Sequence, residues 1–147
     1  MSGITLAQAS TIVDVALKKG RDLNLKPLVV AVLDAGGHLV AYKREDKSPI
    51  LRFQIATGKA YGALGMGMGS RGLFERSQKN PIFVQMLGMV SDGRVMGVPG
   101  GVLILDAAGD TIGAVGISGD TSDNDEAAAL AGIEAAGLKA ETGLGKG

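Results

Sequence analysis

A lysine in a run of small residues is the first candidate for chemistry in this chain. Lys59 stands close to Ala56, Ala60 and Ala63, at spacings that place them together on one part of a helix. Small neighbours leave an ammonium group open to a ligand, and partial burial would lower its pKa and suit it to an anion or a carbonyl group. The competing interpretation is that the long side chain reaches into solvent. The pattern leaves both alternatives open.

The second candidate is the only histidine. His38 directly follows two glycines of a predicted turn. An imidazole can ligate iron or another metal ion, or carry protons near neutral pH. A polar residue beside a turn is also commonly just exposed to solvent, and the corresponding position of a second, similar turn is Asp110. One histidine without any cysteine argues against a structural zinc site, so no metal site is expected.

Glycines suggest where a ligand could approach the backbone. Pro99-Gly100-Gly101 precedes an apolar run that predicts a strand. Backbone amides without side chains beside them can hold the polar groups of a ligand. The same residues would also suit a β-bulge or a tight bend. We predict a ligand pocket between the Lys59 helix and this segment.

Acidic and basic side chains elsewhere offer further candidates. Asp125 and Glu126 end an acidic stretch that lacks the alternating ligands and central glycine of a calcium loop. The stretch primarily predicts a helix N-terminus, with either carboxylate as the acid or base beside Lys59. Arg71 lies between two predicted helices and could face an anion. Its segment, 67–72, matches G-x-G-x-x-G but follows a helix, which argues against dinucleotide binding.

Two copies of one pattern predict the strands that position these residues. Residues 33–41 and 105–113 each contain an apolar run, Asp-Ala, a glycine-containing reversal and a second apolar run. Aspartate bonds nearby backbone amides and glycine adopts positive φ, so each copy predicts a β-hairpin. The expected strands are 28–33, 39–42, 102–105 and 111–117, with a further strand at 95–98.

Helices are predicted around these hairpins. Helical spacing of apolar residues and capping residues mark them. The resulting order is one helix, two strands, two or three helices, three strands and one helix, an α+β fold with an antiparallel sheet of about five strands. The expected helices run from Thr5 to about residue 20, from Pro49 to 64, from a cap at Ser70 to just before Pro81, from Pro81 to 89, and from Thr121 or Ser122 through Ala140.

Glycine is unusually frequent, with 24 residues against an average near 7%. Inside an exposed helix each would cost ~1 kcal/mol relative to alanine, so we predict close backbone packing at those that fall in helices. These are Gly58, Gly62, Gly65, Gly132 and Gly137. With 46% hydrophobic and only 20% charged residues, the chain is expected to form a homo-oligomer, a dimer or larger.

Composition excludes several classes of protein. The net charge is zero and no long basic run occurs, which argues against nucleic-acid binding. No apolar stretch reaches the ~18 residues of a membrane span, and the first residues lack the features of a signal peptide. The 147 residues therefore predict a single cytoplasmic domain over 1–147, without a membrane partner.

Several of these motifs together resemble the GlcG/HbpS-like family, also called the haem-degrading domain family, which includes the PduO C-terminal domain. The resemblance covers about Thr5 to Gly137 and rests on four motifs in the same order. These are the hairpin 29–41, the Ala-x-x-Lys-Ala helix at 56–60, Pro-Gly-Gly at 99–101, and Gly-x-x-Gly-Ile-Ser-Gly at 113–119 before Asp125-Glu126.

The resemblance implies a PAS/profilin-like α+β domain, assembly into dimers and larger rings, and a family of haem- or corrinoid-binding modules and catabolic-operon proteins. Two functions follow as hypotheses. The first is a small-molecule-binding protein, with haem or a related tetrapyrrole as ligand and cofactor. The second is a cofactor-free isomerase, lyase or hydrolase acting on an oxygenated organic acid or carbonyl compound. A subunit that only stabilises a partner enzyme is a third alternative.

Overall fold

The computed structural model describes residues 3–144, and its centre is a five-stranded antiparallel sheet. The strand order is β2-β1-β4-β3-β5, so the two predicted hairpins lie side by side and pair through β1 and β4. The α+β class and the five-stranded sheet are therefore confirmed. The strands are β1 (Val29–Asp34), β2 (Leu39–Arg44), β3 (Gly101–Leu105), β4 (Thr111–Ser118) and β5 (Lys139–Glu141).

Both hairpin turns are built in the same way. In the first, Asp34 Oδ1 accepts hydrogen bonds from the backbone N–H groups two and four residues later, both at 2.9 Å. Asp106 Oδ1 does the same in the second turn at 3.0 and 2.9 Å. Gly37 and Gly109 follow with φ of +86° and +89°, a region that glycine adopts without steric cost. The repeated sequence therefore encodes a repeated turn.

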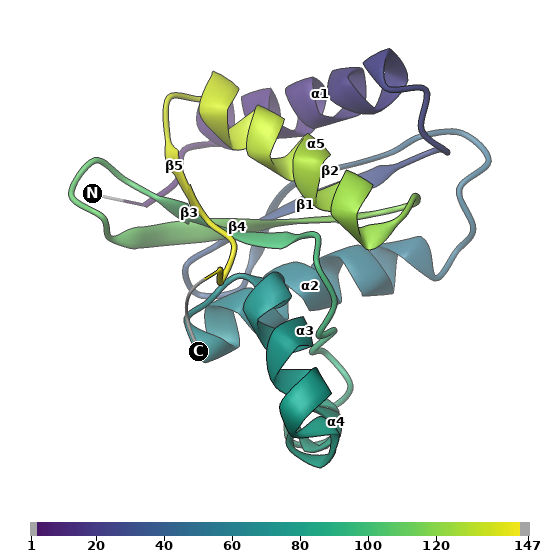
Figure 1. Cartoon of the computed structure of the whole chain (residues 1–147). Helices are drawn as coiled ribbons and strands as arrows, with labels where there is room; N and C mark the ends of the chain where they lie inside the picture. Colours follow the sequence, from purple (N-terminus) through teal and green to yellow (C-terminus); the bar gives the residue numbers. More distant parts are fainter. Residues whose placement is uncertain (1–2, 145–147) are drawn as a thin grey trace.

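Helices cover both faces of the sheet (Figure 1). α1 and α5 lie together on one face, over the larger hydrophobic core, and α2 packs on the other face. α3 and α4 follow α2 and extend away from the sheet in Figure 1. The helices are α1 (Leu6–Asp22), α2 (Arg52–Met66), α3 (Ser70–Lys79), α4 (Pro81–Val90) and α5 (Ser122–Ala135).

The helix starts show which capping predictions hold. Thr5 caps α1 in a capping box with Gln8, and the Thr121 side chain caps α5, as predicted. Ser70 does not cap α3, because Gly69 occupies that position and the Ser70 hydroxyl is buried against β3. The cap that the sequence assigned to Ser70 is therefore wrong.

One strand lies elsewhere than predicted. Residues 95–98 form no strand, because this segment lies against α2 and the Met96 N–H donates to the Gly58 carbonyl at 3.1 Å. The fifth strand is β5, which pairs with β3 at the edge of the sheet. The last helix consequently ends at Ala135, short of the predicted Ala140, and the chain turns back at Gly137 with φ of +74°.

Glycines allow α2 to lie directly on the sheet. Gly101 and Gly116 are partners across β3 and β4. A Cβ on Gly116 would lie 1.8 Å from the Ala56 carbonyl oxygen, and one on Gly101 would lie 2.2 Å from that of Lys59. Real Cβ atoms essentially never come so close, so both positions require glycine for the packing of α2.

Close packing also explains three of the five helical glycines. Added Cβ atoms at Gly58, Gly62 and Gly132 would meet neighbouring segments at 2.6–3.0 Å, as predicted. Gly65 has nothing within 4 Å, so packing does not require it, and Gly137 serves the turn after α5. No helix among residues 3–144 is long and apolar enough to cross a membrane.

Candidate functional site

An open cavity of about 250 Å³ lies where the first hairpin meets α2. Its walls come from three segments that are distant in sequence: the hairpin, one side of α2 and the loop after α4. Apolar side chains dominate the lining, with one cation. The lining residues are Leu33, Gly37, Leu39, Phe53, Gln54, Thr57, Tyr61, Gly93 and Arg94. We call this cavity the hairpin pocket.

His38 stands between two lining residues of the hairpin pocket, Gly37 and Leu39. Its side chain is 81% exposed, and its Nδ1 lies 3.2 Å from Asp34 Oδ1. Hydrogen bonds from the backbone of the turn, that of His38 first, hold the pKa of Asp34 below its usual value. An ionised Asp34 favours the tautomer with the proton on Nδ1, which leaves the lone pair of Nε2 for a ligand.

A cation and an aromatic ring meet in the wall of the same pocket. The Arg94 guanidinium lies 4.2 Å from the centre of the Tyr61 ring. A Cβ on Gly37 would come within 3.2 Å of that ring, so glycine lets the turn lie against Tyr61. Phe53 is held edge-on against Tyr42, with ring centres 5.0 Å apart. The pocket therefore offers aromatic surface together with a positive charge for an acidic group.

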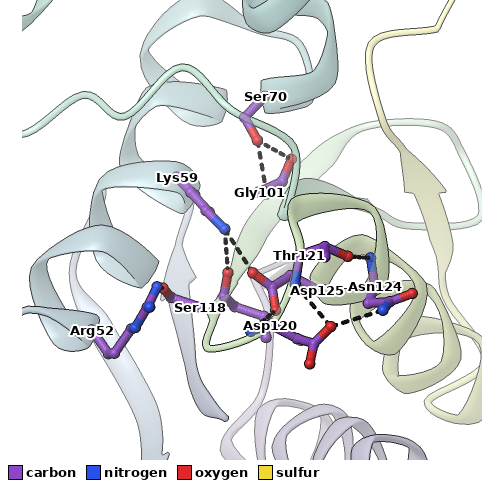
Figure 2. A network of polar contacts seen from close by, with 10 residues as sticks. Arg52, Lys59, Ser70, Gly101, Ser118, Asp120, Thr121, Asn124 and Asp125 are labelled. Carbon is purple, nitrogen blue, oxygen red and sulfur yellow. Dashed lines mark hydrogen bonds and ion pairs between the residues drawn. The ribbon is translucent and has the colours of Figure 1, made fainter. Parts of the chain in front are cut away.

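Lys59 occupies a different environment, inside the protein (Figure 2). Only 2% of the residue is exposed. Its Nζ donates to the Ile117 carbonyl at 2.8 Å and to Asp125 Oδ2 at 3.0 Å. The other Asp125 oxygen accepts from the Asp120 N–H at 3.0 Å. The pair joins α2 to the end of β4 and to α5, and its polar contacts face protein.

Burial acts on both members of this pair in opposite directions. It lowers the pKa of Lys59 and raises the pKa of Asp125, and in each case the charge of the partner opposes the shift. The attraction between the two charges and their further hydrogen bonds offset the cost of removing both charges from water. The interpretation of Lys59 as a cation open to a ligand, or reaching into solvent, does not fit its burial.

The space beside Gly100 and Gly101, which the sequence analysis assigned to a ligand, is filled by protein. Gly101 packs on the backbone of α2, and a Cβ on Gly100 would lie 2.8 Å from Lys59 Nζ. Ser70 closes the other side, since its Oγ accepts from the Gly101 N–H at 2.8 Å. The glycines thus serve the approach of α2, and at Gly100 and Gly101 packed protein occupies the space where the ligand pocket was predicted.

Arg71 and Glu126 form a second ion pair, nearer the surface. Arg71 Nε lies 3.0 Å from Glu126 Oε2, and its Nη2 contacts Asp123. The hydrogen bonds that Arg71 donates to these carboxylates, Glu126 first, raise the pKa of Arg71. Arg71, Pro99 and Asp123 line a shallow hollow of about 270 Å³ at the start of α5. Because Arg71 already has two carboxylate partners, an anion there would have to compete with them.

The predicted site residues therefore divide into three groups. Lys59, Asp125, Gly100 and Gly101 meet in the interior, while Arg71, Glu126 and Pro99 lie together near the start of α5. His38 stands apart from both groups. It lies between Gly37 and Leu39, which line the hairpin pocket, but it is not itself a lining residue. Within residues 3–144, no group of three or more His, Asp and Glu side chains could hold a metal ion.

The sequence interpretation selected none of the residues that line the hairpin pocket. Phe53, Thr57 and Tyr61 recur at intervals of four residues, which places them on one side of a helix. That spacing could have indicated a shared surface on α2. No comparable signal marks Arg94, because it reaches the pocket from the loop after α4.

Fold and pocket together define an α+β domain with one antiparallel sheet between helices and a small aromatic pocket at a hairpin. A family model described as haem-degrading protein HbpS-like matches residues 4–134. The chain belongs to this family.

Relatives and solved structures agree with this assignment. An uncharacterized 15.0 kDa protein in the dhaT-dhaS intergenic region of Citrobacter freundii is 30% identical over 122 residues, 83% of this chain and 84% of that protein. The Klebsiella pneumoniae protein ORFY superposes with a TM-score of 0.81 at 27% identity, covering 91% of this chain and 90% of that one. A PduOC:heme complex superposes with a TM-score of 0.83 at 23% identity, covering 93% and 97% of the two chains.

Proposed function

We propose that this protein binds haem or a related tetrapyrrole at the hairpin pocket, with His38 as the iron ligand. The observation that carries the proposal is the exposure of the His38 imidazole and its contact with Asp34. Its imidazole is exposed between two pocket residues, and Asp34 bonds its Nδ1. Ligating histidines commonly donate the other ring N–H to a carboxylate, which orients the ring and strengthens the ligand.

The other residues of the pocket fit the chemistry of the group. Phe53, Tyr61 and Leu39 provide apolar and aromatic surface for a flat macrocycle. Arg94 provides a cation for a propionate, since guanidinium and carboxylate form strong charge-assisted hydrogen bonds. Bound haem would supply a redox-active iron, while the chain itself would hold and orient it.

The size of the pocket limits how such a ligand would lie. About 250 Å³ is just below the range of ~300–1,000 Å³ usual for small-molecule sites. A macrocycle would therefore insert one edge, and the remainder would extend over exposed surface. The half-exposed side chain of Leu39 lies beside the opening and provides apolar contact there.

Two comparisons support haem as the ligand class. The family to which the chain belongs is described as haem-degrading, and a structure with a closely similar fold was solved as a haem complex. The alternative of a cofactor-free enzyme gains no comparable support. Its proposed cation, Lys59, is bound to Asp125 in the interior.

Titration with haemin tests this proposal. We expect the wild-type protein to shift the Soret band with a stoichiometry of one haem per chain. His38→Ala should weaken binding about tenfold or more and change the Soret band, since an axial ligand is lost. Asp34→Asn should also weaken binding, because a carboxylate that bonds the other ring nitrogen of a ligating histidine typically contributes about tenfold or more to affinity.

A matched control comes from the second hairpin. Asp110 occupies the position equivalent to His38 in the repeated turn, so Asp110→Ala perturbs a similar turn away from the pocket. It should bind haemin as the wild type does. A wild-type spectrum identical to that of free haemin, or unchanged binding by His38→Ala, would refute the proposal.

A further inference from the structure

α4 is an apolar helix, and the rest of the described chain leaves one of its faces largely exposed. None of its ten residues is buried. It carries no charged side chain, and it projects from the body of the domain beyond α3 (Figure 1). Exposed apolar patches of more than a few hundred Å² mark sites of interaction in proteins of this size. The exposed apolar side chains of α4 therefore indicate a contact surface.

The apolar side chains of α4 lie on one outward face. Positions 82, 83, 86, 89 and 90 follow the spacing i, i+1, i+4, i+7, i+8, which is one side of an α-helix. The inward side carries Val84, Leu87 and Gly88, all half-buried, with Val84 directed toward Gly97. The outward side chains are 36% to 80% exposed and comprise Ile82, Phe83, Met86, Met89 and Val90.

Charged residues at the two ends of α4 indicate which kind of partner would cover its exposed apolar face. Lys79 precedes the helix and Asp92 follows it, and both are exposed. Lys79 lies seven residues before Met86 and Asp92 six residues after it. When two copies of α4 pack antiparallel about an axis at Met86, Lys79 of each copy comes near Asp92 of the other. Ile82 then faces Val90, so the apolar stripe also matches itself.

A membrane surface fits the same face less well. Helices that lie on membranes carry lysine and arginine along a polar face, whereas α4 itself has none and the charges of Lys79 and Asp92 at its ends cancel. One cation from α3 lies near the face, since the Arg76 guanidinium is 5.4 Å from the centre of the Phe83 ring. An isologous contact, by contrast, uses one patch on both subunits and needs a self-complementary surface. The apolar residues of α4, together with Lys79 and Asp92 beyond its two ends, have this property.

We propose that α4 is a contact between two copies of this chain, packed antiparallel about a two-fold axis near Met86. The contact buries the outward apolar face of each copy, and the Lys79–Asp92 pairs at both ends set the direction. The inference is independent of haem binding, because the hairpin pocket draws none of its lining residues from α4.

The first experiment introduces a charge at the axis. Met86→Asp places two carboxylates against each other and should halve the mass of the assembly, or raise the dissociation constant about tenfold or more, in sedimentation experiments. Because Met86 is exposed on the surface, circular dichroism should show an unchanged fold. Leu6→Asp is the control, since Leu6 is 65% exposed on α1 and should leave the mass unchanged.

The second experiment tests the antiparallel direction. Lys79→Glu alone gives acidic groups at both ends of α4, and Asp92→Lys alone gives basic groups at both ends. Each variant should therefore associate more weakly than the wild type. A mixture of the two should associate about threefold or more strongly than either alone at low salt, because opposite charges then meet across the contact.

The outcomes separate the alternatives. An assembly unaffected by Met86→Asp would place the contact elsewhere and overturn the proposal. A mixture no stronger than its components would refute the antiparallel arrangement. A wild-type monomer at tens of micromolar would also overturn the proposal, and co-sedimentation of that monomer with phosphatidylcholine vesicles would then assign α4 to a membrane surface.

Discussion

Removing the ammonium group of Lys59 should destabilise this protein strongly. In Lys59→Met the side chain still fills much of the space, but Asp125 loses the counterion 3.0 Å away. The two side chains are only 3% and 1% exposed, so water cannot replace the lost partner. Breaking such a buried pair on one side costs about 3–5 kcal/mol, which lowers the melting temperature of a domain of this size by about 10 °C or more.

A second pair of the same chemistry provides the control. Lys43 lies 2.8 Å from Asp14, but these side chains are 61% and 57% exposed. Exposed pairs contribute about 0–1 kcal/mol. Lys43→Met should therefore change the free energy of unfolding far less than Lys59→Met, although the contact is slightly shorter. Urea or thermal unfolding of both variants measures the difference directly.

The pH dependence identifies the cause of the loss. Burial already raises the pKa of Asp125 in the wild type, and Lys59 opposes that shift. Without Lys59 the pKa of the folded state rises further above the unfolded value of about 3.9. The loss of stability in Lys59→Met should be smallest below the unfolded-state pKa of Asp125, where the carboxyl group is neutral in both states. It should grow as pH rises through the pKa of Asp125 in the folded state. Adding Asp125→Asn to Lys59→Met should restore part of the stability at neutral pH.

Equal losses for Lys59→Met and Lys43→Met would refute this reasoning, as would a defect in Lys59→Met that does not depend on pH. The result bears on function as well. A stability loss without any change in haemin affinity would place Lys59 in the structure of the fold, while a stable variant that lost affinity would return it to the binding site.

Two further predictions concern glycine packing and a surface carboxylate. Gly116→Ala should lose more than about 3 kcal/mol of stability in urea unfolding, because its Cβ would lie 1.8 Å from a backbone oxygen of α2. Gly65→Ala, with nothing within 4 Å, should instead gain about 0.5–1 kcal/mol, and equal effects of the two would contradict the packing argument. Hydrogen bonds, that of Asn124 first, lower the pKa of Asp120 to about 2, so its ionised form stabilises the fold above its unfolded value of about 4. Asp120→Asn should cost about 1 kcal/mol at neutral pH after allowance for solvent screening, and acid unfolding curves should show this difference shrinking as pH falls toward 2.

Local interactions account for what could be predicted. The hairpin turns depend on bonds from Asp34 and Asp106 to backbone groups within four residues, and the caps at Thr5 and Thr121 reach three residues ahead. Such interactions are complete within a short stretch of sequence. They were sufficient for the class of fold and for four of its five strands.

The fifth strand shows where local patterns mislead. Residues 95–98 have the apolar character of a strand, but α2 offers them a backbone contact beside Gly58. β5 is only three residues long and forms because β3 has a free edge beside it. Neither fact can be inferred from the residues themselves, since both depend on which surfaces lie nearby.

The residues of interest were recognised more reliably than their roles. Lys59, Gly101 and Asp125 were all selected as ligand-facing, and all three lie in the interior, where they contact protein. The sequence pattern suggested a pocket, but it is ambiguous. A lysine among small residues is compatible with access of a ligand and equally with close packing against other protein segments. Burial distinguishes these cases, and burial is a property of the assembled fold.

The sequence by itself determined the two hairpins, the capped helices, the α+β class and the resemblance to a family, because short-range bonds and motifs encode them. Only the tertiary structure decided that Lys59 pairs with Asp125, 66 residues away, and that Tyr61, Arg94 and the His38 turn form one pocket. Contacts of this range exist only after the sheet has brought distant segments together. Patterns within a short stretch of sequence do not encode which distant segments will meet. The Lys59–Asp125 pair and the hairpin pocket can therefore be recognised only in the folded structure.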